Sequence, residues 1–276
     1  MDRKSQGRRA VVGFLAALPL CASGLAFAAD DPDDPDPDDP DADECAPSDK
    51  LDVLLLGNSY TNMGDLRGVL ESLGTEAGLS LSVSKLAIGG ANFEKHVGRS
   101  KTAATIRESS WDAVVLQSHS LDTIRNPDGF AKAGRKLVTM VQETGARPVL
   151  FQTWPRMAGH NLYGYMKKAG GSPAAMLSIV KERYAALAEA TGAEVAPVGE
   201  AWLAALAADP GLRLHASDKN HPGRLGTYLT ANVLFATLTD VTPVGNVACP
   251  PDIAEGTAAQ LQEIAAVVCE PSCEAV

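Results

Sequence analysis

The chain has 276 residues, and 45% of them are apolar, which is enough to bury one sizeable hydrophobic core. Its formal net charge is −10, and no basic patch points to nucleic acid as a partner. The composition therefore predicts one globular domain, once the ends that cannot fold are set aside.

Residues 1–29 have the pattern of a secretory signal peptide. Four basic residues lie within the first nine, an apolar run extends from Val11 to Leu25, and Ala26-Phe27-Ala28 offers small residues for cleavage. The apolar run is too short for a comfortable membrane span. We therefore expect export to the periplasm or the exterior, with no stable membrane insertion after cleavage. A retained N-terminal anchor and lipoprotein anchoring at Cys21 remain the alternatives.

Residues 30–44 form an acidic, proline-rich segment. Ten of them are Asp or Glu, four are Pro, and none is large and apolar. Such a segment cannot bury enough surface to offset its loss of conformational entropy, so we expect an extended, disordered linker. Calcium binding is the alternative, but the segment lacks the glycine of an EF-hand loop. Because this linker accounts for the negative charge, the predicted domain at 45–276 is only mildly acidic.

The remaining sequence alternates between short apolar runs and longer segments with helical spacing. The apolar runs predict five strands, at 52–56, 79–88, 111–116, 148–151 and 194–198. The helical patterns lie at 66–77, 93–107, 130–144, 173–191, 200–208, 223–237 and 253–268. This alternation predicts an α/β fold, a three-layer α/β/α sandwich around a five-stranded parallel sheet.

Parallel sheets of this kind bind ligands beyond the carboxyl ends of their strands. One of the loops at that edge contains Gly57-Asn58-Ser59, directly after the first strand. A serine hydroxyl there can act as a nucleophile if a base lies beside it. The alternatives are that Ser59 caps the following helix, or that the loop is a flavodoxin-like phosphate cradle.

The second candidate element is Asp218-Lys219-Asn220-His221, in a loop before the helix predicted at 223–237. A histidine that accepts a serine proton needs a carboxylate on its other ring nitrogen. A spacing of three residues within a turn lets one loop supply both groups. The alternative is a helix-capping aspartate with an incidental histidine.

Together the two elements resemble the first and fifth blocks of the SGNH (GDSL-like) hydrolases, in a bacterial branch that has Gly-Asn-Ser in the first block. The resemblance implies a flavodoxin-like SGNH fold and a catalytic triad of Ser59, His221 and Asp218. It also implies an oxyanion hole formed by the backbone N–H of Ser59, the N–H of Gly90 or its neighbour Gly89, and an amide side chain after the third strand.

The third oxyanion donor departs from the family pattern, because no Gly-x-Asn-Asp follows the third strand. Gln117 has the same amide on a longer arm and is our candidate, with Asn92 as the alternative. Asn58 replaces the usual aspartate, and we expect it to hold the loop by hydrogen bonds. Asn58, Asn92, His119 and Trp154 are also candidate substrate contacts, although Trp154 equally fits a packed core position.

The cysteines of the predicted domain are Cys45, Cys249, Cys269 and Cys273. In an exported protein an even number predicts up to two disulfides, and the sequence leaves all three pairings open. Buried free thiols are the alternative. The spacings lack a paired CxxC signature, and no HExxH or similar pattern occurs, so we expect no metal and no organic cofactor.

The resemblance implies a secreted serine esterase whose substrate is an ester-bearing small molecule or a polysaccharide, with O-acetyl groups on carbohydrate as our preferred class. A lipase or thioesterase of the same family is an alternative. A further alternative is a non-catalytic glycan-binding module on the same fold, since fold transfers more safely than function.

Overall fold

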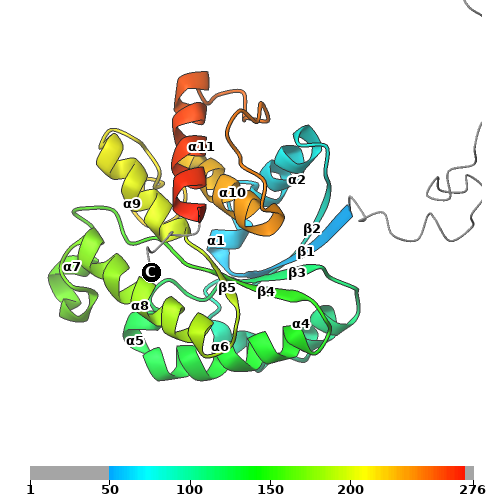
Figure 1. Cartoon of the computed structure of the whole chain (residues 1–276). Coiled ribbons are helices and arrows are strands. Elements are labelled where there is room, and N and C mark those ends of the chain that lie inside the picture. Colours follow the sequence, from blue (N-terminus) through cyan, green and yellow to red (C-terminus); the bar gives the residue numbers. More distant parts are fainter. Residues whose placement is uncertain (1–49, 271–276) are drawn as a thin grey trace, which may run out of the picture. The chain divides into compact units, whose positions relative to one another are not determined.

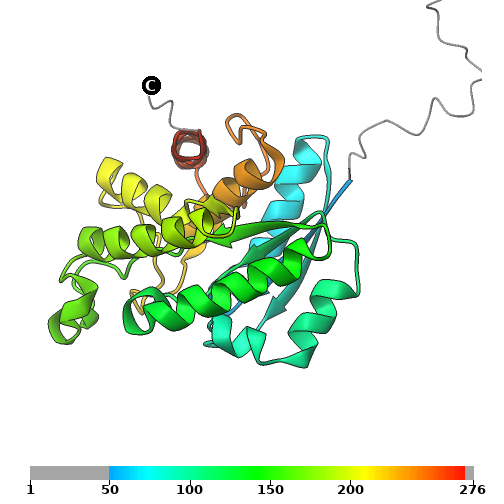
Figure 2. The ribbon, with the colours of Figure 1, turned by 60° about the horizontal axis from the view of Figure 1, so that its bottom comes forward.

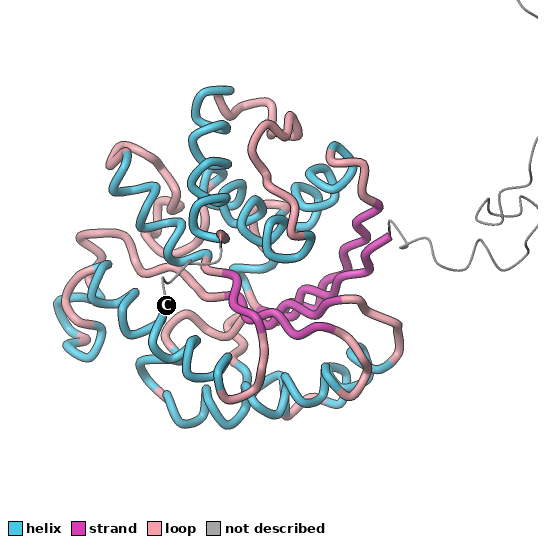
Figure 3. Tube along the Cα trace, in the orientation of Figure 1, coloured by secondary structure: helices cyan, strands magenta, loops and turns pink. Residues whose placement is uncertain are grey.

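The computed structural model describes residues 50–270, so the predicted signal peptide and linker lie outside the described residues. Its centre is a sheet of five parallel strands in the order β2-β1-β3-β4-β5, which Figures 1 and 3 show side by side. The strands are β1 (Lys50–Gly57), β2 (Ser80–Ala87), β3 (Ala113–Leu116), β4 (Arg147–Phe151) and β5 (Glu194–Ala196).

Helices cover both faces of the sheet, which makes three layers (Figures 1 and 2). One face has α2 (Leu66–Glu76), α9 (Val198–Ala208), α10 (Arg224–Thr239) and α11 (Glu255–Cys269). The other has α3 (Phe93–Val97), α4 (Ser100–Arg107), α5 (Asp122–Arg125), α6 (Pro127–Gln142) and α8 (Pro173–Glu189). This arrangement confirms the predicted fold class. Short elements complete it: α1 (Ser59–Asn62), α7 (Leu162–Tyr165) and the 3₁₀ helix η1 (Lys167–Ala169).

The interior strand β1 contributes to the two larger hydrophobic cores of the described residues, because successive side chains of a strand point to opposite faces. Val53 and Leu55 pack with α2, α9, α10 and α11, whereas Leu54 and Leu56 pack with α3, α4, α6 and α8. All four side chains are at most 1% exposed. The continuous apolar run seen in the sequence is therefore the signature of a strand buried on both faces.

The predicted elements are present, but the single helix expected at 93–107 is wrong. It is two helices, because α3 ends at Val97, Gly98 caps it, and Arg99 adopts an extended backbone before α4 begins. The helix predicted from residue 130 begins earlier, at Pro127, since Asn126 caps it and proline is well suited to the first helical position.

Candidate active site

The predicted nucleophile lies at a sharp junction between β1 and α1, with the Ser59 residue half-buried. Glycine is required just before it, because a Cβ on Gly57 would lie 2.1 Å from Thr61 Oγ1 and 2.6 Å from Gln117 Oε1. Asn58 caps α1, since its Oδ1 accepts a hydrogen bond from the Tyr60 N–H at 3.1 Å. The chain therefore turns tightly enough to present a serine at the end of the strand.

Asn58 is 2% exposed and ties two loops together. Its Nδ2 donates to the Ala91 carbonyl at 2.8 Å, which joins the loop after β1 to the loop after β2. This is the loop-holding arrangement expected from the sequence. The expected substrate contact by Asn58 is wrong, because both ends of its amide are occupied inside the protein.

Gln117 is fully buried and contradicts its predicted role as an oxyanion donor. Its Oε1 accepts from the Asn58 N–H at 2.9 Å and from the Thr61 hydroxyl at 3.0 Å, while its Nε2 donates to the Ser118 carbonyl. The longer glutamine arm folds beneath the nucleophile loop, and its amide is fully buried away from a substrate. Gln117 instead supports the backbone that presents Ser59.

The loop at 214–223 is closed by backbone hydrogen bonds from Ala216 to the His221 carbonyl at 2.8 Å and from Gly223 to the Leu214 carbonyl at 2.7 Å. Within it, Asp218 Oδ1 accepts from the backbone N–H groups of Asn220 at 3.0 Å and His221 at 2.9 Å. The carboxylate is thereby fixed relative to the ring of His221.

Ser59, His221 and Asp218 form a hydrogen-bonded chain, although 162 residues separate the serine from the histidine. Ser59 Oγ lies 2.9 Å from His221 Nε2, and His221 Nδ1 lies 2.5 Å from Asp218 Oδ2. An imidazole that donates from Nδ1 to the carboxylate keeps Nε2 free to accept the serine proton. The structure brings the three predicted residues together in the order that this chemistry needs.

The Asp218 carboxylate is held in its ionised form. Burial alone would raise its pKa, but hydrogen bonds from the His221 ring and from the backbone of His221 and Asn220 outweigh burial and lower the pKa to about 2. A carboxylate that is ionised at neutral pH stabilises the imidazolium that forms when a serine proton is transferred.

Two backbone donors predicted for the oxyanion hole are available. Within residues 50–270, no hydrogen bond uses the N–H of Ser59 or of Gly90. Gly90 has a φ of +63° in a turn closed by the Ala91 N–H and the Ile88 carbonyl at 2.9 Å, a conformation that favours glycine. The hydrogen bond between Asn58 and the Ala91 carbonyl holds this turn beside the nucleophile loop.

Asn92 and His119 line a shallow cavity of about 340 Å³ next to Gly90. The Asn92 Oδ1 caps α3 by accepting from the Lys95 N–H at 3.0 Å, and its Nδ2 donates to Asp122 at 3.2 Å and to Glu94 at 3.4 Å. These bonds contradict the alternative of Asn92 as the third oxyanion donor. Both residues remain positioned to border a substrate group beside Gly90.

Trp154 does not form a substrate wall, because its side chain is fully buried. It stacks between Tyr60, at a centroid distance of 4.3 Å, and Trp202, at 4.0 Å. Its indole N–H donates to the Asn220 carbonyl at 3.0 Å. The core interpretation of Trp154 is therefore the correct one, and the stack supports the loop that holds His221.

A buried polar network, which the sequence pattern did not predict, lies behind the triad. Tyr60 donates its hydroxyl to Asn220 Oδ1 and accepts from Arg156 Nη1. Arg156 also donates to the Ser120 hydroxyl at 3.0 Å. The sequence did contain one sign of this network, because Ser120 follows β3 and Arg156 follows β4, at the edge of the sheet where ligands bind.

The described cysteines, Cys249 and Cys269, are free thiols, so they are not joined to each other. Cys45 and Cys273 lie outside the described residues, and the predicted disulfides stay a prediction. Among residues 50–270, no group of three or more His, Cys, Asp or Glu side chains could hold a metal. No helix in that range has the length and apolar character to cross a membrane.

Comparison with known proteins finds similar folds among solved structures. A protein from Slackia heliotrinireducens that has been assigned to the SGNH hydrolases is 30% identical, with 68% of this chain and 98% of that chain covered and a TM-score of 0.59. A DUF4886 family protein from Bacteroides uniformis is 20% identical, with 79% of this chain and 94% of that chain covered and a TM-score of 0.71. The acetyl xylan esterase AlAXEase is 16% identical, with 67% of this chain and 98% of that chain covered and a TM-score of 0.54. No protein-family model and no curated protein matches the chain.

Proposed function

The chain belongs to the SGNH (GDSL-like) hydrolase superfamily, and we propose that it is a serine esterase that acts through Ser59, His221 and Asp218. The observation that carries the proposal is the hydrogen-bonded chain from the Ser59 hydroxyl to the His221 ring at 2.9 Å and on to the Asp218 carboxylate at 2.5 Å. The three groups meet at the loops where ligands of parallel sheets bind.

In the proposed reaction, Ser59 Oγ attacks the ester carbonyl while His221 Nε2 takes the hydroxyl proton. His221 then gives this proton to the leaving alcohol, and an acyl-enzyme forms on Ser59. The same imidazole next removes a proton from water, which attacks the acyl group and releases the acid. Asp218 orients the ring and balances its charge throughout.

We assign the oxyanion to two backbone donors, the N–H groups of Ser59 and Gly90. Both are free of other hydrogen bonds within the described residues, and both belong to loops that Asn58 joins. Donors fixed before the reaction stabilise the developing negative charge without reorganising. Neither donor depends on a side chain, so substitution of Gln117 is expected to act through the loop it supports.

O-acetyl groups on carbohydrate are our preferred substrate class. The cavity beside Gly90 is bordered by polar side chains, among them Asn92, His119 and Asp122, which suit a hydroxyl-rich ligand. One neighbour of the same fold is named as an acetyl xylan esterase. The pattern of residues 1–29 adds the proposal that the enzyme acts after export.

The decisive variant is Ser59→Ala. It removes the nucleophile but keeps the hydrogen bond by which Asn58 caps α1. We expect hydrolysis of p-nitrophenyl acetate to fall to background while the circular dichroism spectrum is unchanged. Ser72→Ala, an exposed serine in α2, is the matched control and should retain full turnover. Equal turnover in Ser59→Ala and the parent protein would refute the proposal.

A fluorophosphonate probe tests the same site without a substrate. We expect one covalent adduct, located on Ser59 by peptide mass spectrometry and lost in Ser59→Ala. An unlabelled folded protein would contradict the esterase and favour a glycan-binding module. Initial rates on acetylated xylan, short-chain p-nitrophenyl esters and phospholipids then separate a carbohydrate esterase from a lipase.

A further inference from the structure

A second cavity, of about 490 Å³, lies between α9, the start of α8 and the loop at 155–158. Its volume is within the usual range of small-molecule sites, roughly 300–1,000 Å³. The wall is almost entirely apolar and includes Met157, Pro173, Trp202, Leu203, Leu206 and Ala207. Neither Ser59 nor His221 lines it, although Arg156 and Trp202, which lie behind the triad, do.

Arg156 also lines the cavity and is 5% exposed. Its Nη1 donates to the hydroxyls of Tyr60 and Ser120, but within residues 50–270 it forms no ion pair, and its Nε and Nη2 have no hydrogen-bond partner. Burial raises the pKa of Tyr60, so the phenol is neutral and does not balance the guanidinium. A guanidinium that lines a cavity and keeps N–H groups without partners can donate them to an anionic ligand.

We propose that this cavity binds an amphiphile with a carboxylate head and an unbranched apolar chain, such as a medium-chain fatty acid. The apolar walls suit the chain, and the free N–H groups of Arg156 suit the carboxylate, which guanidinium recognises through paired hydrogen bonds. This site goes beyond the proposed esterase activity, and its occupancy does not depend on Ser59.

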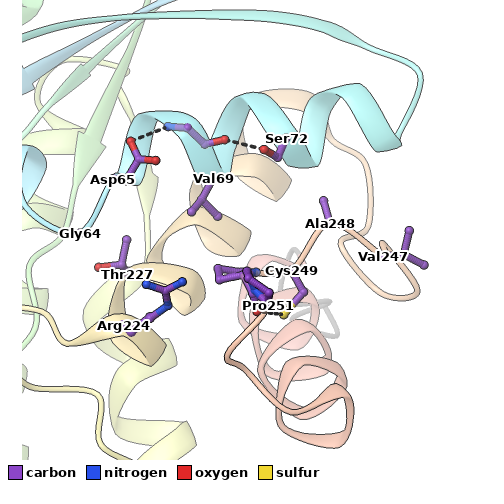
Figure 4. Close-up of a pocket in the computed structure, with 12 residues that line it drawn as sticks. Gly64, Asp65, Val69, Ser72, Arg224, Thr227, Val247, Ala248, Cys249 and Pro251 are labelled. Atoms are coloured by element: carbon purple, nitrogen blue, oxygen red, sulfur yellow. Dashed lines mark hydrogen bonds between the residues drawn. The ribbon is translucent and has the colours of Figure 1, made fainter.

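Another cavity, of about 510 Å³, is lined by an arginine that already has a carboxylate partner (Figure 4). Its Arg224 is ion-paired with Asp252, and its Asp65 is occupied as the cap of α2. Val69 of α2 borders this cavity and is half-buried, like Leu206 in the apolar one. The two cavities therefore supply a matched pair of positions for a test.

The experiment is isothermal titration calorimetry on the Ser59→Ala protein, with decanoate, decanol and decyltrimethylammonium below their micellar concentrations. We expect one decanoate site that is roughly tenfold or more tighter than either of the other two ligands, as a hydrogen-bonded charge implies. Equal affinity for all three ligands, or no binding of decanoate, would overturn the proposal. The outcome is independent of catalysis, because the nucleophile is absent.

Two variants locate the site. Leu206→Phe fills the apolar cavity and should abolish decanoate binding, whereas Val69→Phe fills the other cavity and should leave it unchanged. The reverse pattern would place the ligand elsewhere and refute the assignment.

Arg156→Gln should remove the preference for decanoate over decanol, and a retained preference would contradict the role of the guanidinium. If Arg156→Gln does not fold, the pair of phenylalanine variants still decides.

Discussion

At the scale of single residues, the contact between Asp218 and His221 sets how the site responds to acid. Hydrogen bonds lower the Asp218 pKa from its ordinary 3.8 to about 2. A carboxyl group whose pKa is lower in the folded state than in the unfolded state adds stability to the fold. This contribution is complete at pH values above the unfolded-state pKa, and it is lost as the pH falls through the folded-state pKa. A ¹³C NMR titration should place the Asp218 midpoint near pH 2 and move it upward in His221→Ala. An unchanged midpoint would contradict the assigned cause.

Asn58→Asp would restore the residue that the family pattern has at this position, yet we expect it to be harmful. The Nδ2 of Asn58 donates to the Ala91 carbonyl, and a carboxylate oxygen in its place would face that carbonyl without a hydrogen. We expect a loss of about 1–3 kcal/mol in urea unfolding and slower p-nitrophenyl acetate turnover. The exposed Asn161, whose side chain makes no capping bond, is the control, because Asn161→Asp should be nearly neutral.

The sequence was informative about residues whose chemistry depends on local spacing. Asp218 and His221 lie three residues apart in one loop, and Ser59 directly follows a buried strand, so type and position together pointed to them. Gln117 was misassigned and Trp154 was left with two interpretations, because the direction of both side chains depends on tertiary packing: one folds under the nucleophile loop and the other stacks within the core. Only the three-dimensional arrangement decides such orientations.

At the scale of elements, α10 packs closely against the start of the loop at 214–223, so an added side-chain atom there should destabilise the protein. A Cβ on Gly226 would lie 2.2 Å from the Leu214 carbonyl and 2.5 Å from the Trp202 ring. We expect Gly226→Ala to cost about 1–3 kcal/mol by overpacking. Because Leu214 leads into the loop that carries Asp218 and His221, kcat should fall as well.

Gly256→Ala in α11 is the matched control, since a Cβ there would meet nothing within 4 Å. Its stability should stay the same or rise by less than about 1 kcal/mol, because alanine favours helix more than glycine does. Urea unfolding of both variants measures the difference. Equal stabilities would show that α10 can shift away from the loop without penalty.

The same scale explains which elements could be predicted. Long runs with clear periodicity identified the five strands and the long helices, because burial on one or both faces fixes the pattern. The break between α3 and α4 was missed, since one glycine does not by itself end a helix. Elements of four residues, such as α1 and α7, carry too little periodicity to be recognised and depend on neighbouring loops.

At the scale of the whole molecule, the two larger hydrophobic cores of residues 50–270 pack on opposite faces of one sheet. Leu54 and Val53 are adjacent in β1 but belong to opposite cores. A strand that loses its packing on one face cannot keep its register on the other, because the same backbone carries both sets of side chains. The described domain is therefore expected to unfold in one cooperative transition.

Leu137→Ala tests this coupling, because Leu137 of α6 is fully buried in the core opposite to Trp154 and Trp202. The truncation should cost about 2–5 kcal/mol. In a Trp111→Phe background, tryptophan fluorescence reports only the core of Trp154 and Trp202, while far-UV circular dichroism reports both faces. We expect both urea midpoints to fall by the same amount, since one transition carries both signals. A fluorescence midpoint that stays in place while the dichroism midpoint falls would mean that the two faces unfold independently.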